Sequence, residues 1–393
     1  MIIREHYISQ IRDFYESNLV KIITGIRRCG KSVILEQIMS EIKRTSDNII
    51  YLNFEDKIIT GNIKDDIDLI NYVQKQRKKG KVYLFFDEIQ ELEGWQYACK
   101  TLRLHEASVF ITGSNSKLLS GEFTKELSGR YVAFRIRPFI YKELTEYGKQ
   151  LNKDISVLDY LIWGGFPGRL EQLNSDSQKR YLNDLYNTIV INDLVRRYKI
   201  RKVAFFTSLV NFILRSNARI FSVKSIYNYV KNKNMTCSIN TIFKFLGYLE
   251  EAYIIERIKQ YSTKVKRDLA FFQKIYDEDV SFNSLMCFDN RFDLTHNLEN
   301  IVFNELLYRN YNLTVFNNNG KEIDFLAEKS GKKYYIQVAY SVMEDKAYER
   351  EFGAFKNISQ LDRKIIITND EIDLSTSNVE HINLKKFLLL EDF

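Results

Sequence analysis

Short, continuous apolar runs alternate with helix-patterned stretches over the first third of the chain. Residues 20–23, 82–86 and 109–112 are rich in β-branched and aromatic side chains, and residues 33–39 repeat apolar positions at helical spacing. A continuous apolar run of this length is typical of a strand buried on both faces of a parallel sheet. The pattern therefore predicts an α/β class, with an N-terminal parallel sheet, flanking helices and a last strand at residues 132–136.

The rest of the chain changes from helical to mixed patterning. Residues 176–199 repeat apolar side chains at helical spacing and predict one amphipathic helix. Residues 203–262 predict three short helices and then a β-ribbon, with Ser222 and Ser238 as N-caps of the second and third helices. This order is typical of a winged helix. The predicted parts are an N-terminal domain at 1–140, a helical connector at 141–202, a winged-helix domain at 203–270 and a small α/β domain at 271–393.

The most informative segment lies between the first strand and the first patterned helix. Residues 25–32 spell GIRRCGKS, which matches GxxxxGKS in the strand, loop and helix context of a phosphate-binding P-loop. Its glycines let backbone N–H groups close around phosphate oxygens, and the following helix points its positive end at them. We expect Lys31 to neutralise the β and γ phosphates and the Ser32 hydroxyl to bind Mg²⁺. The predicted nucleotide-binding residues are Gly25, Ile26, Arg27, Arg28, Cys29, Gly30, Lys31, Ser32 and Val33.

Two acids follow the second apolar run. Asp87 and Glu88 come directly after residues 82–86. Because the carboxyl ends of parallel strands form the ligand-binding edge of such a sheet, both acids are expected near the P-loop. We expect Asp87 to hold Mg²⁺, through water or together with Ser32, and Glu88 to polarise the attacking water.

Polar residues at two further positions are candidates for contact with the γ-phosphate. The run at 109–112 ends in Thr112 and is followed by Ser114 and Asn115. The pattern does not choose among these three as the sensor of the γ-phosphate. Asn115 is included among the expected nucleotide contacts. Arg130 precedes the last strand and is a catalytic candidate that could reach the γ-phosphate of a neighbouring subunit. A solvated or ion-paired arginine is the alternative.

Several motifs in a fixed order resemble one known family. TGIRRCGKS, FFDEIQ with Trp95 close behind, ITGSNS, LSGR and RPF are similar to a bacterial and archaeal family of AAA-type ATPases. Later segments agree, namely WGGFPGRL, NDLYNTIVINDLVRRY and KEIDFLAE with YYIQVAYS. The resemblance spans essentially the whole chain. It implies a P-loop ATPase domain, a winged-helix segment and a C-terminal domain similar to PD-(D/E)xK nucleases.

That resemblance also implies a degenerate nuclease site. Glu299 on a helix, Asp324 on a strand and Gln337 on the next strand match the nuclease skeleton, in which the acids hold Mg²⁺ and a lysine positions or activates water. The lysine is expected two residues after Gln337, where this chain has Ala339. Nuclease activity is therefore not expected.

Charge is distributed unevenly along the chain. The net charge is +7, but residues 196–270 carry 16 basic and 4 acidic side chains, and residues 271–393 carry 14 and 21. The basic stretch predicts contact with duplex DNA through residues 196–270, and a solvated helix face or a protein-docking module is the alternative. In the DNA hypothesis the third helix places Asn240, Thr241 and Lys244 in a groove, and the basic residues that touch phosphate are Lys264, Lys266 and Arg267.

Composition excludes several other classes of protein. No apolar run approaches the roughly 18 residues of a membrane span, and MIIREHYISQ lacks a signal core, so a cytoplasmic protein without a membrane partner is expected. The four cysteines have no CxxC spacing, which argues against a zinc site or a disulfide framework.

The patterns together predict an enzyme, an AAA-type ATPase with ATP and Mg²⁺ as cofactors. ATP binding and hydrolysis are expected to drive rearrangement of the winged-helix and nuclease-like domains, with DNA and a second copy or another protein as candidate partners. The alternative is a nucleotide-gated DNA-binding or signalling switch with little turnover. A working nuclease is the third and weakest hypothesis.

Overall fold

The computed structural model describes residues 1–114, 126–232, 237–261, 273–287, 294–318, 321–356 and 358–391. The chain divides into two compact units. The first contains Met1–Pro138 and Glu251–Tyr253, and the second contains Phe139–Glu250 and Ile254–Phe393. Within the described ranges, no helix combines the length and the apolar character that a membrane crossing requires.

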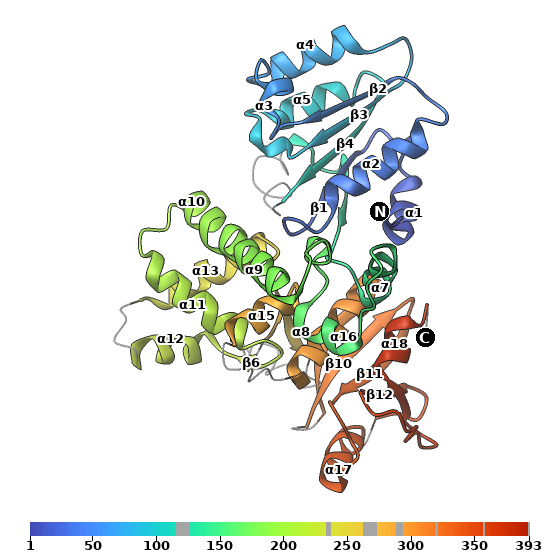
Figure 1. Cartoon of the computed structure of the whole chain (residues 1–393), viewed down its shortest axis with the longest axis vertical. Coiled ribbons are helices and arrows are strands. Elements are labelled where there is room, and N and C mark those ends of the chain that lie inside the picture. Colours follow the sequence, from blue (N-terminus) through green and yellow to red (C-terminus); the bar gives the residue numbers. More distant parts are fainter. Residues whose placement is uncertain are drawn as a thin grey trace. The chain divides into compact units, whose positions relative to one another are not determined.

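The first unit is built on a parallel sheet of five strands (Figure 1). Its strands are β1 (Val20–Thr24), β2 (Ile49–Asn53), β3 (Val82–Asp87), β4 (Ala107–Gly113) and β5 (Tyr131–Arg135). Their spatial order is β2-β3-β4-β1-β5. Every residue of β1, β3 and β4 is buried, as the continuous apolar runs predict. The predicted N-terminal parallel sheet is confirmed, and β2 is an additional strand at one side of it.

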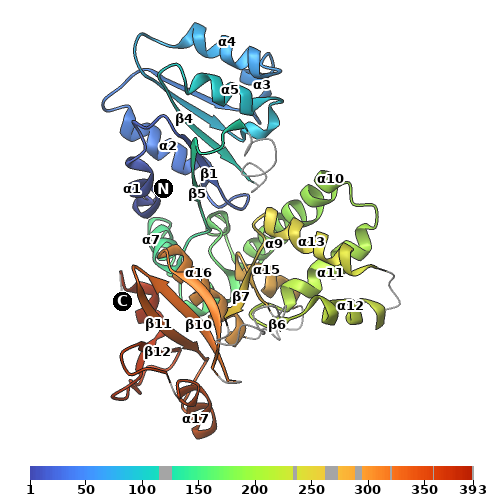
Figure 2. The ribbon, with the colours of Figure 1, turned by 180° about the vertical axis from the view of Figure 1, so that it is seen from behind.

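Helices cover both faces of this sheet (Figures 1 and 2). They are α1 (Glu5–Arg12), α2 (Lys31–Ile42), α3 (Lys57–Thr60), α4 (Asp66–Gln76) and α5 (Trp95–Leu102). Ile22 and Leu84 share one core cluster with Val73 of α4 and Trp95 of α5. Because successive strand residues point to opposite faces, the buried Phe85 lies on the other face of the sheet. The strands are therefore enclosed, and only their ends are open to chemistry.

Helices dominate the first part of the second unit. They are α7 (Tyr141–Gln150), α8 (Val157–Trp163), α9 (Ser175–Tyr186), α10 (Leu194–Tyr198), α11 (Val203–Arg215), α12 (Val223–Asn232) and α13 (Ile239–Glu251). The helix predicted at 176–199 is confirmed, but a π-helical segment, Asn187–Asp193, joins α9 to α10. Both predicted caps are also confirmed, because the Ser222 and Ser238 hydroxyl oxygens each accept a backbone N–H at 3.1 Å.

One mixed sheet of eight strands runs through the rest of the second unit (Figure 2). Its strands are β6 (Ile220–Phe221), β7 (Ile255–Tyr261), β8 (Gln273–Asp277), β9 (Asn312–Asn318), β10 (Lys321–Lys329), β11 (Lys332–Val338), β12 (Arg363–Thr368) and β13 (Glu380–Asn383). Four helices accompany them, α15 (Val280–Met286), α16 (Leu294–Tyr308), α17 (Asp345–Gly353) and α18 (Leu384–Leu389).

Strand pairing joins the three-helix segment, which consists of α11 to α13, to the C-terminal α/β segment, which is residues 273–391. β7 pairs antiparallel with β8, and β8 pairs antiparallel with β6, which gives the ribbon expected after three helices. β7 also pairs in parallel with β9, through Gln260 opposite Val315. One sheet therefore crosses the predicted boundary between residues 270 and 271, and the division of the chain into four domains stays a prediction.

Candidate functional site

The loop between β1 and α2 has a backbone shape that favours glycine at both glycine positions of the GxxxxGKS motif. Gly25 has φ 145° and Gly30 has φ 100°, in the region that favours glycine. A Cβ atom on Gly25 would lie 2.1 Å from the carbonyl oxygen of Ile136, which follows β5. The loop thus passes so close to the backbone after β5 that no side chain fits there.

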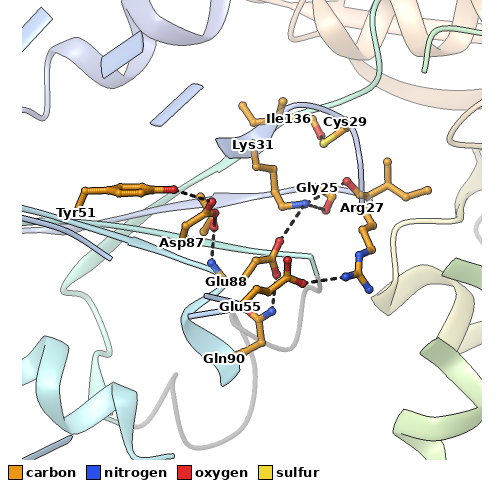
Figure 3. A network of polar contacts seen from close by, with 12 residues as sticks. Gly25, Arg27, Cys29, Lys31, Tyr51, Glu55, Asp87, Glu88, Gln90 and Ile136 are labelled. Atoms are coloured by element: carbon orange, nitrogen blue, oxygen red, sulfur yellow. Dashed lines mark hydrogen bonds and ion pairs between the residues drawn. The ribbon is translucent and has the colours of Figure 1, made fainter. Parts of the chain in front are cut away.

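Side chains from several elements hold this loop in place. The buried Arg4 donates from Nη1 to the Cys29 carbonyl at 3.1 Å. Cys29 Sγ donates to the Ile136 carbonyl at 3.3 Å. Nearer the surface, the Arg27 guanidinium pairs with Glu55 at 2.8 Å (Figure 3). These contacts with protein groups define the shape of the loop.

Lys31 lies over the loop and reaches toward the end of β3 (Figure 3). Its ammonium donates to the carbonyls of Gly25 and Ile26, both at 3.2 Å, and lies 3.8 Å from Glu88 Oε1. The Lys31 side chain is only 4% exposed. The fold therefore brings the predicted phosphate-binding lysine and the predicted water-activating acid together at one edge of the sheet.

Asp87 is the last residue of β3 and is held by two hydroxyl groups. Thr112 Oγ1, on the neighbouring strand β4, donates to Asp87 Oδ1. The Tyr51 hydroxyl, on β2, donates to Asp87 Oδ2 at 3.4 Å. Asp87 is 1% exposed, so hydroxyl donors from both neighbouring strands replace water around its carboxylate and hold its orientation.

Glu88 leaves the strand in a left-handed conformation, with φ 48°. Its N–H donates to Thr112 Oγ1 at 2.9 Å, so one threonine contacts both acids. Glu88 Oε2 accepts from Gln90 Nε2 at 2.5 Å, at the start of the short 3₁₀ helix Ile89–Glu91. This backbone turn directs the Glu88 carboxylate toward Lys31 instead of back into the sheet.

The remaining predicted residues have different positions. Ser32 and Val33 lie in the first turn of α2 and are half-buried, and Arg28 of the loop is exposed. Ser114 follows β4 directly, and Asn115 lies outside the described residues. Of the three sensor candidates, Thr112 contacts the two acids.

Arg130 lies at the amino-terminal end of the strands, whereas its own P-loop follows their carboxyl end. β5 runs parallel to β1, with Tyr131 opposite Val20 and Arg135 opposite Thr24. Arg130 therefore lies beside the start of β1, roughly 16 Å of strand away from the loop that follows β1. It is exposed, and it does not reach the site of its own chain.

Three contributors were missed by the sequence patterns. Tyr51 had a weak signal, because it lies near the carboxyl end of a short β-rich run beside β3. Gln90 is two residues after Glu88, and apart from this closeness no sequence signal pointed to it. Arg4 precedes the first helix, and nothing in its neighbourhood marks it as a contact of the loop.

The donor set at this edge fits Mg²⁺ when a nucleotide is bound. A carboxylate from Asp87 and a hydroxyl from Ser32 are hard oxygen donors, and Mg²⁺ usually takes one or two protein oxygens together with phosphate and water. Among the described residues, no group of three or more His, Cys, Asp and Glu side chains is arranged to hold a metal ion alone. The nucleotide phosphates would have to complete the coordination.

Comparison with protein families divides the chain into three matches. Residues 17–145 match a family described as AAA domain, which covers the sheet, the loop and both acids. Residues 155–289 and 295–387 match two different families, each described as a domain of unknown function.

Two relatives match over nearly the whole chain. An uncharacterized protein of Haemophilus influenzae is 33% identical, over 94% of this chain and 93% of its own length. An uncharacterized protein of Methanocaldococcus jannaschii is 32% identical, over 90% of this chain and 83% of its own length. Among solved structures, AMPPCP-bound DnaA from Aquifex aeolicus matches with a TM-score of 0.35 and 17% identity, over 64% of this chain and 90% of that one.

Proposed function

Because the chain belongs to one family with the uncharacterized Haemophilus influenzae and Methanocaldococcus jannaschii proteins, and its residues 17–145 match the AAA domain, we propose that it binds ATP with Mg²⁺ and hydrolyses it to ADP. In this proposal the loop from Gly25 to Val33 surrounds the phosphates. Lys31 neutralises the β and γ phosphates, and Ser32 and Asp87 hold Mg²⁺. Glu88 orients and polarises the attacking water.

One observation carries this proposal, the convergence of Lys31 and Glu88. Their charged groups lie 3.8 Å apart, although the residues are far apart in sequence and come from different elements. A bound γ-phosphate would replace Glu88 and the Gly25 and Ile26 carbonyls as the partner of the ammonium. Glu88 would then lie on the side from which water attacks.

Binding of Mg-ATP to a charge-deletion variant tests the nucleotide half of the proposal. Lys31→Ala removes the phosphate-binding ammonium, and Lys43→Ala, at the exposed end of α2, removes the same charge away from the loop. We expect the Kd measured by calorimetry to rise at least about 10-fold for Lys31→Ala, since a charge-assisted hydrogen bond contributes about 1.5–3 kcal/mol. Lys43→Ala should bind as wild type does. Wild-type affinity in Lys31→Ala would contradict the proposal.

A second function, contact with duplex DNA, is proposed for the three-helix segment. The sequence contains no acidic residue from Leu194 to Leu249. Within this stretch Lys224 and Lys231 on α12 and Lys244 on α13 are exposed, as is Asn240, whereas Thr241 is half-buried. Lys264, Lys266 and Arg267 lie outside the described residues. The exposed ammonium groups have no acidic neighbour along the chain to oppose a phosphate backbone.

Salt dependence tests this second function. Changing Lys231 and Lys244 together to alanine should weaken binding to duplexes of any sequence and reduce the slope of log K against log salt by about 2. The matched control changes Lys332 and Lys346, exposed lysines of the acidic C-terminal part, and should leave the slope unchanged. An equal slope in wild type and in Lys231→Ala/Lys244→Ala would remove this segment as the contact surface.

A further inference from the structure

One lysine in the second unit is surrounded by three carboxylates. Lys274 lies on β8, Glu299 on α16, and Glu322 and Asp324 on β10. Two of the acids, Glu299 and Asp324, are those that the nuclease resemblance marks as metal ligands. Three separate elements therefore bring their charged groups to one point.

The ammonium of Lys274 is fully engaged by these acids. It donates to Glu299 Oε1 at 2.8 Å and to Asp324 Oδ1 at 2.9 Å, and it lies 2.6 Å from Glu322 Oε1. An ammonium has three N–H donors, and there is one carboxylate for each. The Lys274 side chain is 4% exposed, so water contributes little to its surroundings.

Neighbouring groups complete the same network. The Tyr276 hydroxyl donates to Glu299 Oε1 at 2.6 Å, and the Val338 N–H donates to Asp324 Oδ2 at 3.0 Å. The amide of Gln337 makes other contacts, because its Nε2 donates to Glu351 at 2.8 Å and its Oε1 accepts the backbone N–H of Asp324 at 3.3 Å. Glu299 Oε1 and both carboxylate oxygens of Asp324 thus accept from protein donors, and the amide of Gln337 is used on other groups.

These contacts do not fit a bound metal ion. A Mg²⁺ ion between Glu299 and Asp324 would compete with Lys274 for Glu299 Oε1 and Asp324 Oδ1, and two positive charges would lie within one small buried volume. Nor do they fit a lysine that activates water. Its ammonium donates to Glu299 and Asp324 and pairs with Glu322, so no N–H group remains to orient a water molecule.

We propose that the C-terminal α/β segment carries a divalent-cation site in which the ammonium of Lys274 takes the place of the metal, so that this site binds no divalent cation in the wild-type chain. The lysine that is missing at Ala339 is not replaced by a catalytic one from another strand. Lys274 instead links β8, the return strand of the three-helix ribbon, to α16 and β10. The proposal is independent of the nucleotide site in the first unit.

Mn²⁺ binding to nucleotide-free full-length protein tests the proposal, with free Mn²⁺ measured by electron paramagnetic resonance. Lys274→Met keeps the length of the side chain and removes its charge. Lys333→Met is the control, because Lys333 forms an exposed pair with Glu328 in the same sheet. We expect Lys274→Met to bind one Mn²⁺ per chain more than wild type, and to lose it again when Asp324→Asn is added. Lys333→Met should bind the same number as wild type.

A thermal melt and a nicking assay keep the proposal falsifiable. In EDTA the melting temperature of Lys274→Met should fall below that of wild type, and Mn²⁺ should raise it again. Wild type should show no Mn²⁺ binding that Asp324→Asn removes, and this comparison decides the question even when Lys274→Met fails to fold. Wild-type Mn²⁺ binding that depends on Asp324, a folded Lys274→Met that gains no Mn²⁺, or Mg²⁺-dependent plasmid nicking that Lys274→Met abolishes would each overturn the proposal.

Discussion

Thr112 connects both acids of the candidate site. Its hydroxyl donates to Asp87 and accepts the N–H of Glu88, so its single oxygen sets the position of the carboxylate that would hold Mg²⁺ and of the one that would orient water. Contacts of this kind, one step behind the reacting groups, commonly control metal affinity and activity by about 10- to 100-fold. Thr112 is therefore a positioning residue in the proposed reaction.

Replacing that hydroxyl by a methyl group should slow turnover. Thr112→Val keeps the shape of the side chain, and we expect kcat for ATP hydrolysis to fall about 10- to 100-fold with a smaller change in ATP affinity. Thr112→Ser should restore most of the rate, because the hydroxyl returns. Unchanged kcat and Mg²⁺ dependence in Thr112→Val would show that the hydroxyl does not position the acids.

Lys21 is a buried cation in β1 without a role in the proposed chemistry. Its ammonium donates to Ser108 Oγ at 2.8 Å and to the Ser17 carbonyl at 3.1 Å. Burial, with a smaller effect of Lys81, lowers the pKa of Lys21 from 10.5 to about 7. Between these two values the unfolded chain binds a proton that the folded chain does not bind, so stability rises with pH. Below pH 7 both forms are protonated and the effect is constant.

Lys21→Met should remove this pH dependence. We expect the variant to be more stable than wild type at pH 7, and the advantage to shrink toward pH 9 by up to about 1.4 kcal/mol per pH unit. Urea unfolding of both proteins at the two pH values measures the difference directly. An advantage that stays constant or grows with pH would show that the lysine is not the group responsible.

The roles of residues that belong to one short motif can be predicted from the sequence. The roles of residues that meet only in the folded chain cannot. Lys31, Asp87 and Glu88 follow from short patterns because the chemistry requires those residue types at the ends of strands. Tyr51 and Lys274 make their contacts across elements that no local pattern pairs. Their roles became visible only with the sheet order.

At the scale of elements, the shape of the loop between β1 and α2 depends on the chain that follows β5. Gly25 lies against the Ile136 carbonyl, so the P-loop keeps its shape only while the chain after β5 stays in place. Gly80 offers a comparison, because it also has a positive φ, of 93°, but a Cβ there meets nothing within 4 Å. Alanine at Gly80 would therefore introduce backbone strain alone, whereas alanine at Gly25 would add a steric clash.

Gly25→Ala should abolish nucleotide binding, whereas Gly80→Ala should not. We expect Gly80→Ala to cost about 1 kcal/mol of stability, the usual strain of an alanine with positive φ. Gly25→Ala adds a clash with backbone and should lose measurable Mg-ATP binding in calorimetry. Similar ATP affinities for the two variants would contradict the close packing of the loop against Ile136.

Most elements follow from hydrophobic spacing, and two features do not. The π-helical segment Asn187–Asp193 keeps apolar residues at nearly helical spacing, so its altered hydrogen bonding leaves no trace in the pattern. The pairing of β7 with β9 joins residues 260 and 315, and such long-range register is decided by tertiary packing. The sequence pattern alone therefore predicts the ribbon and the C-terminal strands as separate domains.

At the scale of the whole molecule, Arg130 bears on whether one chain forms the complete ATP site or a second copy contributes to it. Arg130 lies beside the start of β1, at the other end of the strands from the P-loop, so the catalytic role proposed for it is one in trans, at the ATP site of a second copy. Arg130→Ala should therefore lower kcat by about 10³-fold or more, as loss of an arginine finger does. Mixing it with inactive Lys31→Ala protein should recover part of the activity, because each chain supplies what the other lacks. No recovery on mixing would leave Arg130 without this role.

The most direct test of the account is steady-state hydrolysis of Mg-ATP by wild type and Glu88→Gln, each with and without duplex DNA. The proposed roles predict that wild type turns over ATP, and that Glu88→Gln binds ATP with similar affinity but hydrolyses it at least about 100-fold more slowly. Equal rates in the two proteins would contradict the role of Glu88. Tight ATP binding by wild type without hydrolysis in either condition would contradict the ATPase itself and favour a nucleotide-gated switch.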